Sequence, residues 1–491
     1  MKKKLYLCKK IKIAYMRIYL LFIYFIVISL SVSGKEFYCF EGDTSESIFA
    51  KSKDRELAKI TTSTYLEDTA SRNKWSVKAG GYISTDLFWD TRTVIDSRDG
   101  MLCLYPENVQ KDISGKDINA RPSFNFLALN TRISLRIQSP DALGAKISGM
   151  VEGWFAGMSN NDMNGFSMRH AFIKMDWEKS SLLMGQTWHP LFTENCFANT
   201  VAGSAGAPFQ PFSRSAQIRF TQNFLKHSKA MFYISSQRDF LSSGSIGASS
   251  SYLRNSAMPE MGVQYIFTNY HYRGGFLFGL GYDYKYLIPR IITDSNLYTR
   301  KGINSQAVTV FIHYYKKNGR VSYSNSGIKA KAMYSRGCNE FLTLGGYAFK
   351  FYNNDFLNLN NDYQYTTLNS VSSWIDIYMQ KNHWEFGLFG GFAKNLGSQH
   401  RIQNFDNPQA YFARGRDIDY LYRVSFRTVY TVREIGKNLI QFGIEPEYTA
   451  ATYSNRLNEY GLPQKKSDLF PDAKINHVGN LRILLNATLY F

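Results

Sequence analysis

The chain has 491 residues and a formal net charge of +19, from 58 Lys and Arg against 39 Asp and Glu. Aromatic residues make up 16% of the chain although its mean hydropathy is −0.30, a combination that is typical of strands with one polar and one apolar face. The 12 Pro and 36 Gly exclude a low-complexity chain. Because the basic residues are spread singly rather than clustered, nucleic acid is not an expected partner.

Residues 1–34 have the pattern of a cleaved secretory signal peptide. Seven basic residues precede or interrupt the start of an apolar stretch that ends in "IYLLFIYFIVISL", and "SVSG" then supplies small residues for cleavage. The apolar run is shorter than the roughly 20 residues that a spanning helix needs, so a retained anchor is the weaker alternative. Cleavage would remove seven positive charges, lowering the net charge from +19 to +12. The exported chain would still attract anionic lipid headgroups and anionic solutes.

Residues 35–73 are polar and carry mixed charge in "SESIFAKSKDRELAKI", which predicts a short helical or disordered leader. From Trp75 onward the pattern changes to two-residue alternation, and we assign residues 74–491 to one β-domain. In "LNTRISLRIQS" the apolar face holds Leu129, Ile133 and Leu135. Similar segments of about ten residues, the length of a tilted strand that crosses a bilayer, are "AVTVFIHYY", "VSSWIDIYMQ", "YRVSFRTVYTVRE" and the final "LRILLNATLYF".

The spacers between these strands alternate between long and short, which predicts an all-β, up-and-down antiparallel transmembrane barrel with long extracellular loops and short periplasmic turns. A spanning sheet must close on itself because lipid offers its backbone no hydrogen-bonding partners. We therefore expect residues 481–491 to pair with "KAGGYISTDLFWD" near the start of the barrel. Residues 317–369 contribute either one strand or three, so the barrel has 16 strands, with 18 as the alternative. A barrel of that width predicts an aqueous lumen rather than a packed core.

Basic residues on the polar faces of the strands are the strongest functional signal. In a hydrated lumen they would set the electric field that permeating ions experience. Acidic residues such as Glu152, Asp376, Glu445 and Glu447 are interspersed, so the alternative is a solvated lumen without selectivity. The pore-lining candidates are Arg132, Arg136, Arg219, Arg423 and Arg427.

The long spacer "HPLFTENCFANTVAGSAGAPFQPFSRS" is the candidate constriction loop. Its small residues could pack against a barrel wall, and three prolines stiffen it. We expect it to fold into the lumen, with Glu194 and Arg214 as constriction charges. The alternative is an ordinary surface loop.

The sequence contains few candidate catalytic or metal-binding residues. His170 and His189 are the best-placed histidines for a barrel hydrolase, but GxSxG, HExxH and phosphate-binding glycine motifs are missing from the sequence. Cys39, Cys103, Cys196 and Cys338 have no metal-type spacing, and they would be either paired in a disulfide or inert thiols. We therefore predict no enzymatic activity, no metal site and no cofactor.

Several segments together resemble the DcaP-like porins of Bacteroidetes-type bacteria. They include "GGYISTDLFWDTRTVIDSRDGM", "DINARPSFNFLALNTRISL", "LLMGQTWHPLF", "GAPFQPFSRSAQI" and "LYRVSFRTVYTV", and the similarity extends over roughly residues 75–491. The resemblance implies a trimeric porin in the bacterial outer membrane, with a third loop that constricts the channel and small anionic or dicarboxylate-like solutes as cargo.

These observations lead to one functional hypothesis, with two alternatives. We expect passive diffusion of small hydrophilic solutes with a mild preference for anions. The expected partners are those solutes, outer-membrane lipid and lipopolysaccharide, the barrel assembly machinery and two further copies of the chain. The alternatives are an adhesive or structural barrel without an open pore and a barrel-based hydrolase.

Overall fold

The computed structural model describes residues 74–157, 162–201, 203–271, 273–317, 324–353, 362–434 and 437–491. The predicted signal peptide (1–34), the predicted leader (35–73) and Cys39 lie outside the described residues.

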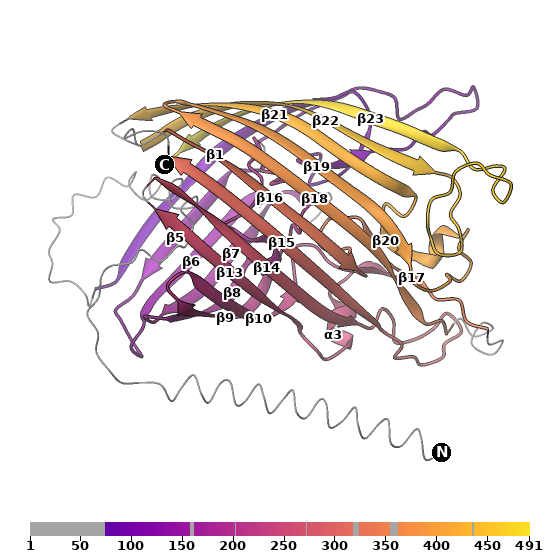
Figure 1. The fold of residues 1–491 in the computed structure, drawn as a ribbon, viewed down its shortest axis with the longest axis horizontal. Coiled ribbons are helices and arrows are strands. Elements are labelled where there is room, and N and C mark those ends of the chain that lie inside the picture. The colour runs from indigo at the N-terminus through magenta and orange to yellow at the C-terminus, as the bar shows by residue number, and fades with distance from the viewer. Residues whose placement is uncertain are drawn as a thin grey trace, which may run out of the picture. The chain divides into compact units, whose positions relative to one another are not determined.

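The described chain forms a closed antiparallel barrel of 16 strands (Figure 1). The barrel closes where the first and last strands pair, from Tyr82 opposite Tyr490 to Asp90 opposite Arg482. Between residues 317 and 369 a single strand joins the wall, so the prediction of 16 strands is confirmed. The wall strands are β1 (Ser76–Asp90), β5 (Arg132–Gln138), β6 (Lys146–Ala156), β7 (Met163–Asp176), β8 (Ser180–Trp188), β9 (Arg214–Leu225), β10 (Ser228–Gln237), β13 (Glu260–His271), β14 (Gly274–Leu287), β15 (Ile303–Lys317), β16 (Ser324–Arg336), β18 (Tyr365–Lys381), β19 (Trp384–Ser398), β21 (Ile418–Glu434), β22 (Lys437–Ser454) and β23 (Ile475–Tyr490).

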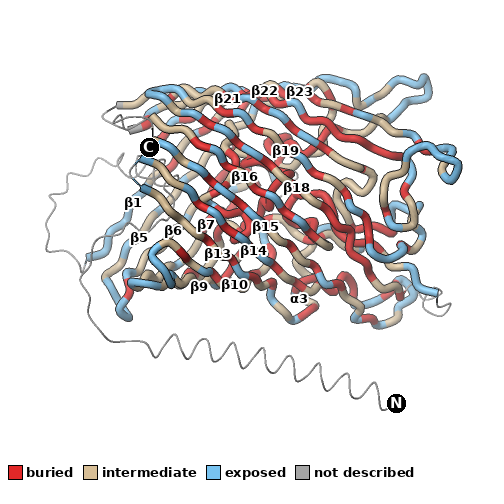
Figure 2. The backbone as a smooth tube through the Cα atoms, viewed as in Figure 1, coloured by how far each residue is buried: buried red, intermediate tan, exposed pale blue. Residues whose placement is uncertain are grey.

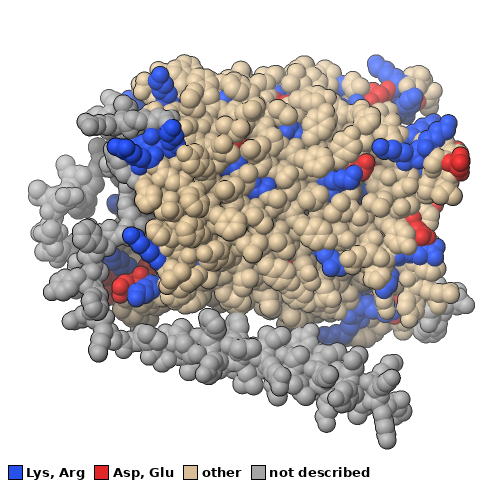
Figure 3. All heavy atoms as spheres, viewed as in Figure 1, with Lys and Arg blue, Asp and Glu red and all other residues tan. Residues whose placement is uncertain are grey.

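Side chains alternate between the lumen and the outer surface along each wall strand, as Figure 2 shows by the alternation of buried and exposed residues. In β23, Leu481, Leu485 and Leu489 are exposed whereas Arg482 and Thr488 are buried. The face in Figure 3 is mostly uncharged between its two ends. Such an apolar outer surface on a closed barrel fits the hydrocarbon layer of an outer membrane. Among the described residues, no helix is both long and apolar enough to cross a membrane.

The long loops gather at the end of the barrel marked by the labels β17 and β20 in Figure 1. Three of them matter below: L1 (residues 91–122), L3 (189–213) and L6 (337–364). L1 contains the hairpin β2 (Val94–Ser97) and β3 (Leu102–Pro106), and β4 (Ser123–Leu127) follows it and pairs with β1. L6 contains β17 (Gly345–Phe349), which pairs with β18 and with β20 (Tyr411–Arg414). The remaining short elements are β11 (Ser243–Gly244), β12 (Gly247–Ala248), α3 (Ser251–Asn255), η2 (Pro190–Phe192) and η3 (Pro408–Ala410).

L1, L3 and L6 fold into the barrel and share one hydrophobic core with its wall. Leu104 of L1, Phe209 of L3 and Leu342 of L6 are each at most 1% exposed, and they belong to the same cluster as the wall residues Phe311 and Phe389. The prediction of an aqueous lumen rather than a packed core is therefore wrong for this part of the barrel. Apolar loop side chains fill the space there because they bury more surface against the wall than they would in water.

Candidate functional site

The lumen retains a cavity of about 630 Å³ on the periplasmic side of L3. Its lining runs from Lys78, Arg136 and Lys229 near the periplasmic strand ends to Thr193 and Ala198 of L3. Nine basic side chains line it against three carboxylates. The basic residues are Lys78, Arg132, Arg136, Arg169, Lys174, Arg219, Lys229, Arg427 and Arg433, and the acidic ones are Glu152, Glu194 and Glu385.

The middle of L3 is held against the wall by a buried ion pair. Arg427 of β21 contacts Asp376 of β18 at 2.6 Å, and both side chains are at most 2% exposed. The same guanidinium donates to the carbonyl oxygen of Asn199 at 2.9 Å and reaches Glu385 at 3.2 Å. Asp376 in turn accepts a hydrogen bond from the backbone amide of Asn199 at 3.1 Å. The pair therefore satisfies both backbone groups of one loop residue.

Further wall side chains bind other parts of L3. Lys329 donates to the carbonyl oxygen of Phe197 at 3.1 Å, and Glu445 accepts from the amide of Val201 at 2.7 Å. Arg423 donates to the carbonyl oxygens of Ala207 in L3 and Cys103 in L1, at 2.8 Å each. The peptide groups of the loops that are buried away from water thus gain hydrogen-bonding partners, which buried peptide groups require.

The opposite side of the cavity carries a cluster of arginines and aromatic rings, which we call the arginine–tryptophan cluster: Arg98, Arg132, Arg169, Arg214, Trp154 and Trp188. Four guanidinium groups surround Trp154, at 4.9, 5.7, 4.3 and 4.6 Å from the ring centroid for Arg98, Arg132, Arg169 and Arg214. Cation–π attraction and two carboxylates hold these like charges together. Asp239 pairs with Arg98 at 2.5 Å and with Arg214 at 2.8 Å.

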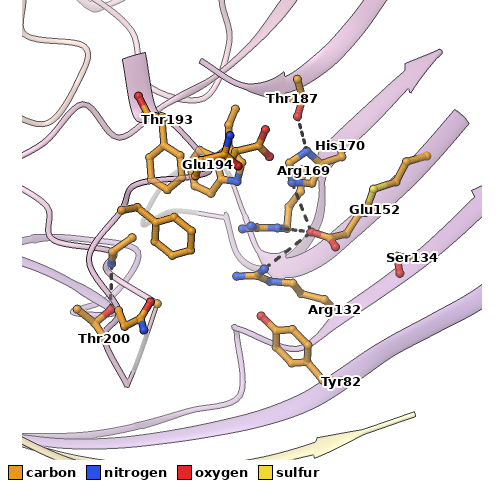
Figure 4. Close-up of a pocket in the computed structure, with 18 of the residues that line it drawn as sticks. Tyr82, Arg132, Ser134, Glu152, Arg169, His170, Thr187, Thr193, Glu194 and Thr200 are labelled. Carbon is orange, nitrogen blue, oxygen red and sulfur yellow. Dashed lines mark hydrogen bonds and ion pairs between the residues drawn. The ribbon is translucent and has the colours of Figure 1, made fainter. Parts of the chain in front are cut away.

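Glu152 is the second carboxylate of this cluster. It lies 2.7 Å from Arg169, 3.9 Å from Arg132 and 3.7 Å from His170. The other ring nitrogen of His170 lies 2.9 Å from the Thr187 hydroxyl. Glu194 and Thr200 of L3 line the same cavity, as Figure 4 shows. With four guanidinium groups against two carboxylates, this wall carries an excess of two positive charges.

The structure separates the predicted site residues into two groups. Arg132, Arg136, Arg219, Arg427 and Glu194 line the cavity. Arg423 and Arg214 are buried away from its lining, the first against L1 and L3 and the second against Asp239 beside Trp154. L3 folds inward, as expected from its sequence.

Strand alternation missed Arg169. A regular strand places neighbouring residues on opposite faces, so strict alternation would place only one of Arg169 and His170 in the lumen. The pairing of β6 with β7 shifts register between Glu152 and Gly153, and this β-bulge turns both Arg169 and His170 into the lumen. The sequence signal that could have pointed to Arg169 is its position next to His170, one of the two histidines singled out above.

The three described cysteines are free thiols buried in the protein. Burial raises the pKa of Cys103 to about 11 and raises the pKa of Cys196 and of Cys338 above the ordinary thiol value. Since the thiolate is the reactive form, we expect the folded protein to resist maleimide at neutral pH. Mass spectrometry before and after unfolding would measure this. Labelling of these three positions in the folded protein at the unfolded rate would contradict it.

Comparisons with solved structures place this fold among outer-membrane channels. The outer membrane channel DcaP of Acinetobacter baumannii matches with a TM-score of 0.58 at 14% identity, covering 86% of this chain and 99% of that chain. An anion-selective porin from Comamonas acidovorans gives 0.47 at 10% identity, covering 85% and 100%, and Pseudomonas putida OprB gives 0.41 at 10%, covering 84% and 94%. No family model and no curated protein matches the sequence. The likeness to DcaP shows a shared fold, and at that level it confirms the resemblance seen in the sequence.

Proposed function

We propose that this protein is an outer-membrane porin through which small hydrophilic solutes diffuse passively, with a preference for anions and without an enzymatic step. The observation that carries the proposal is the nine-to-three excess of basic over acidic side chains around the lumen cavity. Charge of one sign along a narrow, protein-walled space raises the local concentration of the opposite ion.

Selectivity in this proposal comes from a fixed field and a fixed width. L3 sets the width because Arg427, Lys329 and Glu445 hold it against one side of the barrel. The arginine–tryptophan cluster sets the field on the other side, where Glu152 and Asp239 neutralise only part of its charge. An anion would pass between L3 and the arginine–tryptophan cluster. It would exchange bound water for hydrogen bonds from guanidinium groups, and these must be weak enough for the anion to leave.

The hydrolytic alternative has less support. The most enzyme-like histidine, His170, lies beside Thr187 and Glu152, and Glu152 is already paired with two arginines. Such an arrangement suits a fixed charge better than a general base. The trimer implied by the sequence resemblance stays a prediction.

Reconstitution of the purified mature protein in a planar bilayer tests the proposal. We expect stepwise conductance and, across a KCl gradient, a reversal potential displaced toward the chloride equilibrium potential. The displacement should shrink as the salt concentration rises, because salt screens the lumen field. A potassium-leaning reversal potential would overturn the anion preference, and folded protein that inserts without conducting would overturn the porin function itself.

A further inference from the structure

A separate group of ionisable side chains lies buried where L3 leaves the barrel wall. His189 is the first residue of L3, Glu260 and Asp283 face it from β13 and β14, Lys285 follows on β14, and Glu340 comes from L6. Each of the five is at most 2% exposed. The solute pathway proposed above makes no use of this group.

The ring of His189 points its Nε2 atom at two carboxylates without making a hydrogen bond. Nε2 lies 3.6 Å from Glu260 Oε1 and 3.6 Å from Asp283 Oδ2. Both Nε2 and Asp283 Oδ1 are buried without a hydrogen-bond partner among the described residues. Around a tetrahedral metal ion with bonds of about 2.1 Å, neighbouring ligand atoms are about 3.4 Å apart. The two distances from Nε2 are close to that spacing, and all three ligand atoms lie within 4.8 Å of one another.

The charges of the group do not balance without a further cation. Three carboxylates surround one ammonium: Lys285 Nζ lies 2.9 Å from Glu260 and 3.6 Å from Asp283, and it also pairs with Glu340. With all three carboxylates ionised and His189 neutral, the protein groups would leave two negative charges in a fully buried place, which is costly. One divalent cation beside His189 would neutralise them.

Neighbouring side chains already orient the two carboxylates. The Tyr233 hydroxyl donates to Asp283 Oδ2 at 2.8 Å, and the Ser235 hydroxyl donates to Glu260 Oε2 at 3.2 Å, in the manner of the outer-shell hydrogen bonds of metal centres. His189 Nδ1 accepts a long, 3.3 Å hydrogen bond from the amide of Leu191. When a cation binds at Nε2, the ring proton moves to Nδ1 and the hydrogen bond from the Leu191 amide is lost. His189 also lines the lumen cavity, which offers the ion a route to the site.

We propose that His189, Glu260 and Asp283 bind one divalent transition-metal cation of the Zn²⁺ type, with one nitrogen and two oxygen ligands. The ion joins the first residue of L3 to the β13–β14 wall. This inference does not depend on the porin function, because it concerns the attachment of the loop and not the solute.

The test uses the full-length mature barrel, purified without a histidine tag and treated with EDTA. Isothermal titration with Zn²⁺ should show one site per chain, and Co²⁺ should produce the visible absorption of a four-coordinate centre. His189→Asn retains a side-chain oxygen that can accept from the Leu191 amide but removes the imidazole. It should weaken Zn²⁺ binding at least tenfold. His383→Asn, at the β18–β19 turn, is the matched control and should bind like the parent.

Heat-modifiability on a gel shows that each variant is folded. Absence of saturable Zn²⁺ binding by the folded parent overturns the site, whether or not the variants fold. Binding that is unchanged in folded His189→Asn also overturns it and assigns the ion elsewhere. The Zn²⁺ titration does not measure conductance. A negative titration would therefore leave the planar-bilayer test of the porin function unaffected.

Discussion

The double variant Arg132→Gln, Arg219→Gln is expected to lower the chloride-to-potassium permeability ratio by up to about a hundredfold at low salt. Both side chains line the lumen cavity. One unit charge about 6 Å from a permeating ion interacts with it by about 0.7 kcal/mol in water, or about threefold in local ion concentration. Two lost charges lower the chloride concentration about tenfold and raise the potassium concentration about tenfold, so the ratio of the two changes by up to about a hundredfold. Glu152 keeps its 2.7 Å contact with Arg169, so the variant does not leave a buried carboxylate without a partner.

The reversal potential across a KCl gradient measures this effect, and Lys316→Gln is its control. Lys316 is exposed on β15 near the periplasmic end, on the same outer face as Tyr314. The control removes a charge of the same sign, but the barrel wall separates that charge from the lumen. We expect the parent's reversal potential in the control. An unchanged ratio in the double variant would show that these two arginines do not set the selectivity.

Arg427→Gln is expected to release the middle of L3 and to destabilise the barrel by about 3–5 kcal/mol, the usual cost of breaking a buried ion pair. The variant leaves Asp376, which is 0% exposed, without its guanidinium partner. It also removes the hydrogen bond to the carbonyl oxygen of Asn199. Single-channel recordings should show larger and noisier current, and denaturant unfolding followed by tryptophan fluorescence gives the stability.

Two further variants separate the ion pair from a general effect of lost charge. Adding Asp376→Asn to Arg427→Gln removes the stranded carboxylate and should recover much of the stability. Lys394→Gln breaks the pair with Asp419, 3.3 Å apart on the neighbouring strands with Lys394 44% exposed. That exposed pair should cost at most about 1 kcal/mol. Equal losses in Arg427→Gln and Lys394→Gln would contradict the anchoring role of Arg427.

The barrel could be predicted because its signal is local. Each wall strand carries its own alternation, and lipid outside requires an apolar residue at every second position over about ten residues. Thus "LRILLNATLYF" was correctly predicted as the closing strand, and residues 317–369 supply the single wall strand, β16, that completes 16. The alternative of 18 strands arose in the same range, where Leu342 and Leu344 of "FLTLGGYAFKFY" are buried in the loop core and not in the wall.

The filling of the lumen could not be predicted in the same way. Arg423 binds a carbonyl oxygen 320 positions away in L1, and Arg427 one that is 228 positions away in L3. No local pattern links such partners. Alternation gave no indication that the β2–β3 hairpin of L1 folds inward, yet all five residues of β3 are buried.

The sequence by itself determined the fold class and the inward face of each regular strand, and it limited the strand count to 16 or 18, because those depend on the side-chain period of a strand against lipid. Only the tertiary structure decided which inward-facing charges reach the cavity. Arg132 and Arg423 have the same strand parity, but L1 and L3 cover Arg423 and leave Arg132 at the cavity. The bulge that turns Arg169 inward is likewise a property of two paired strands. Loop packing and strand pairing are long-range contacts, and their energies depend on residues that periodicity does not connect.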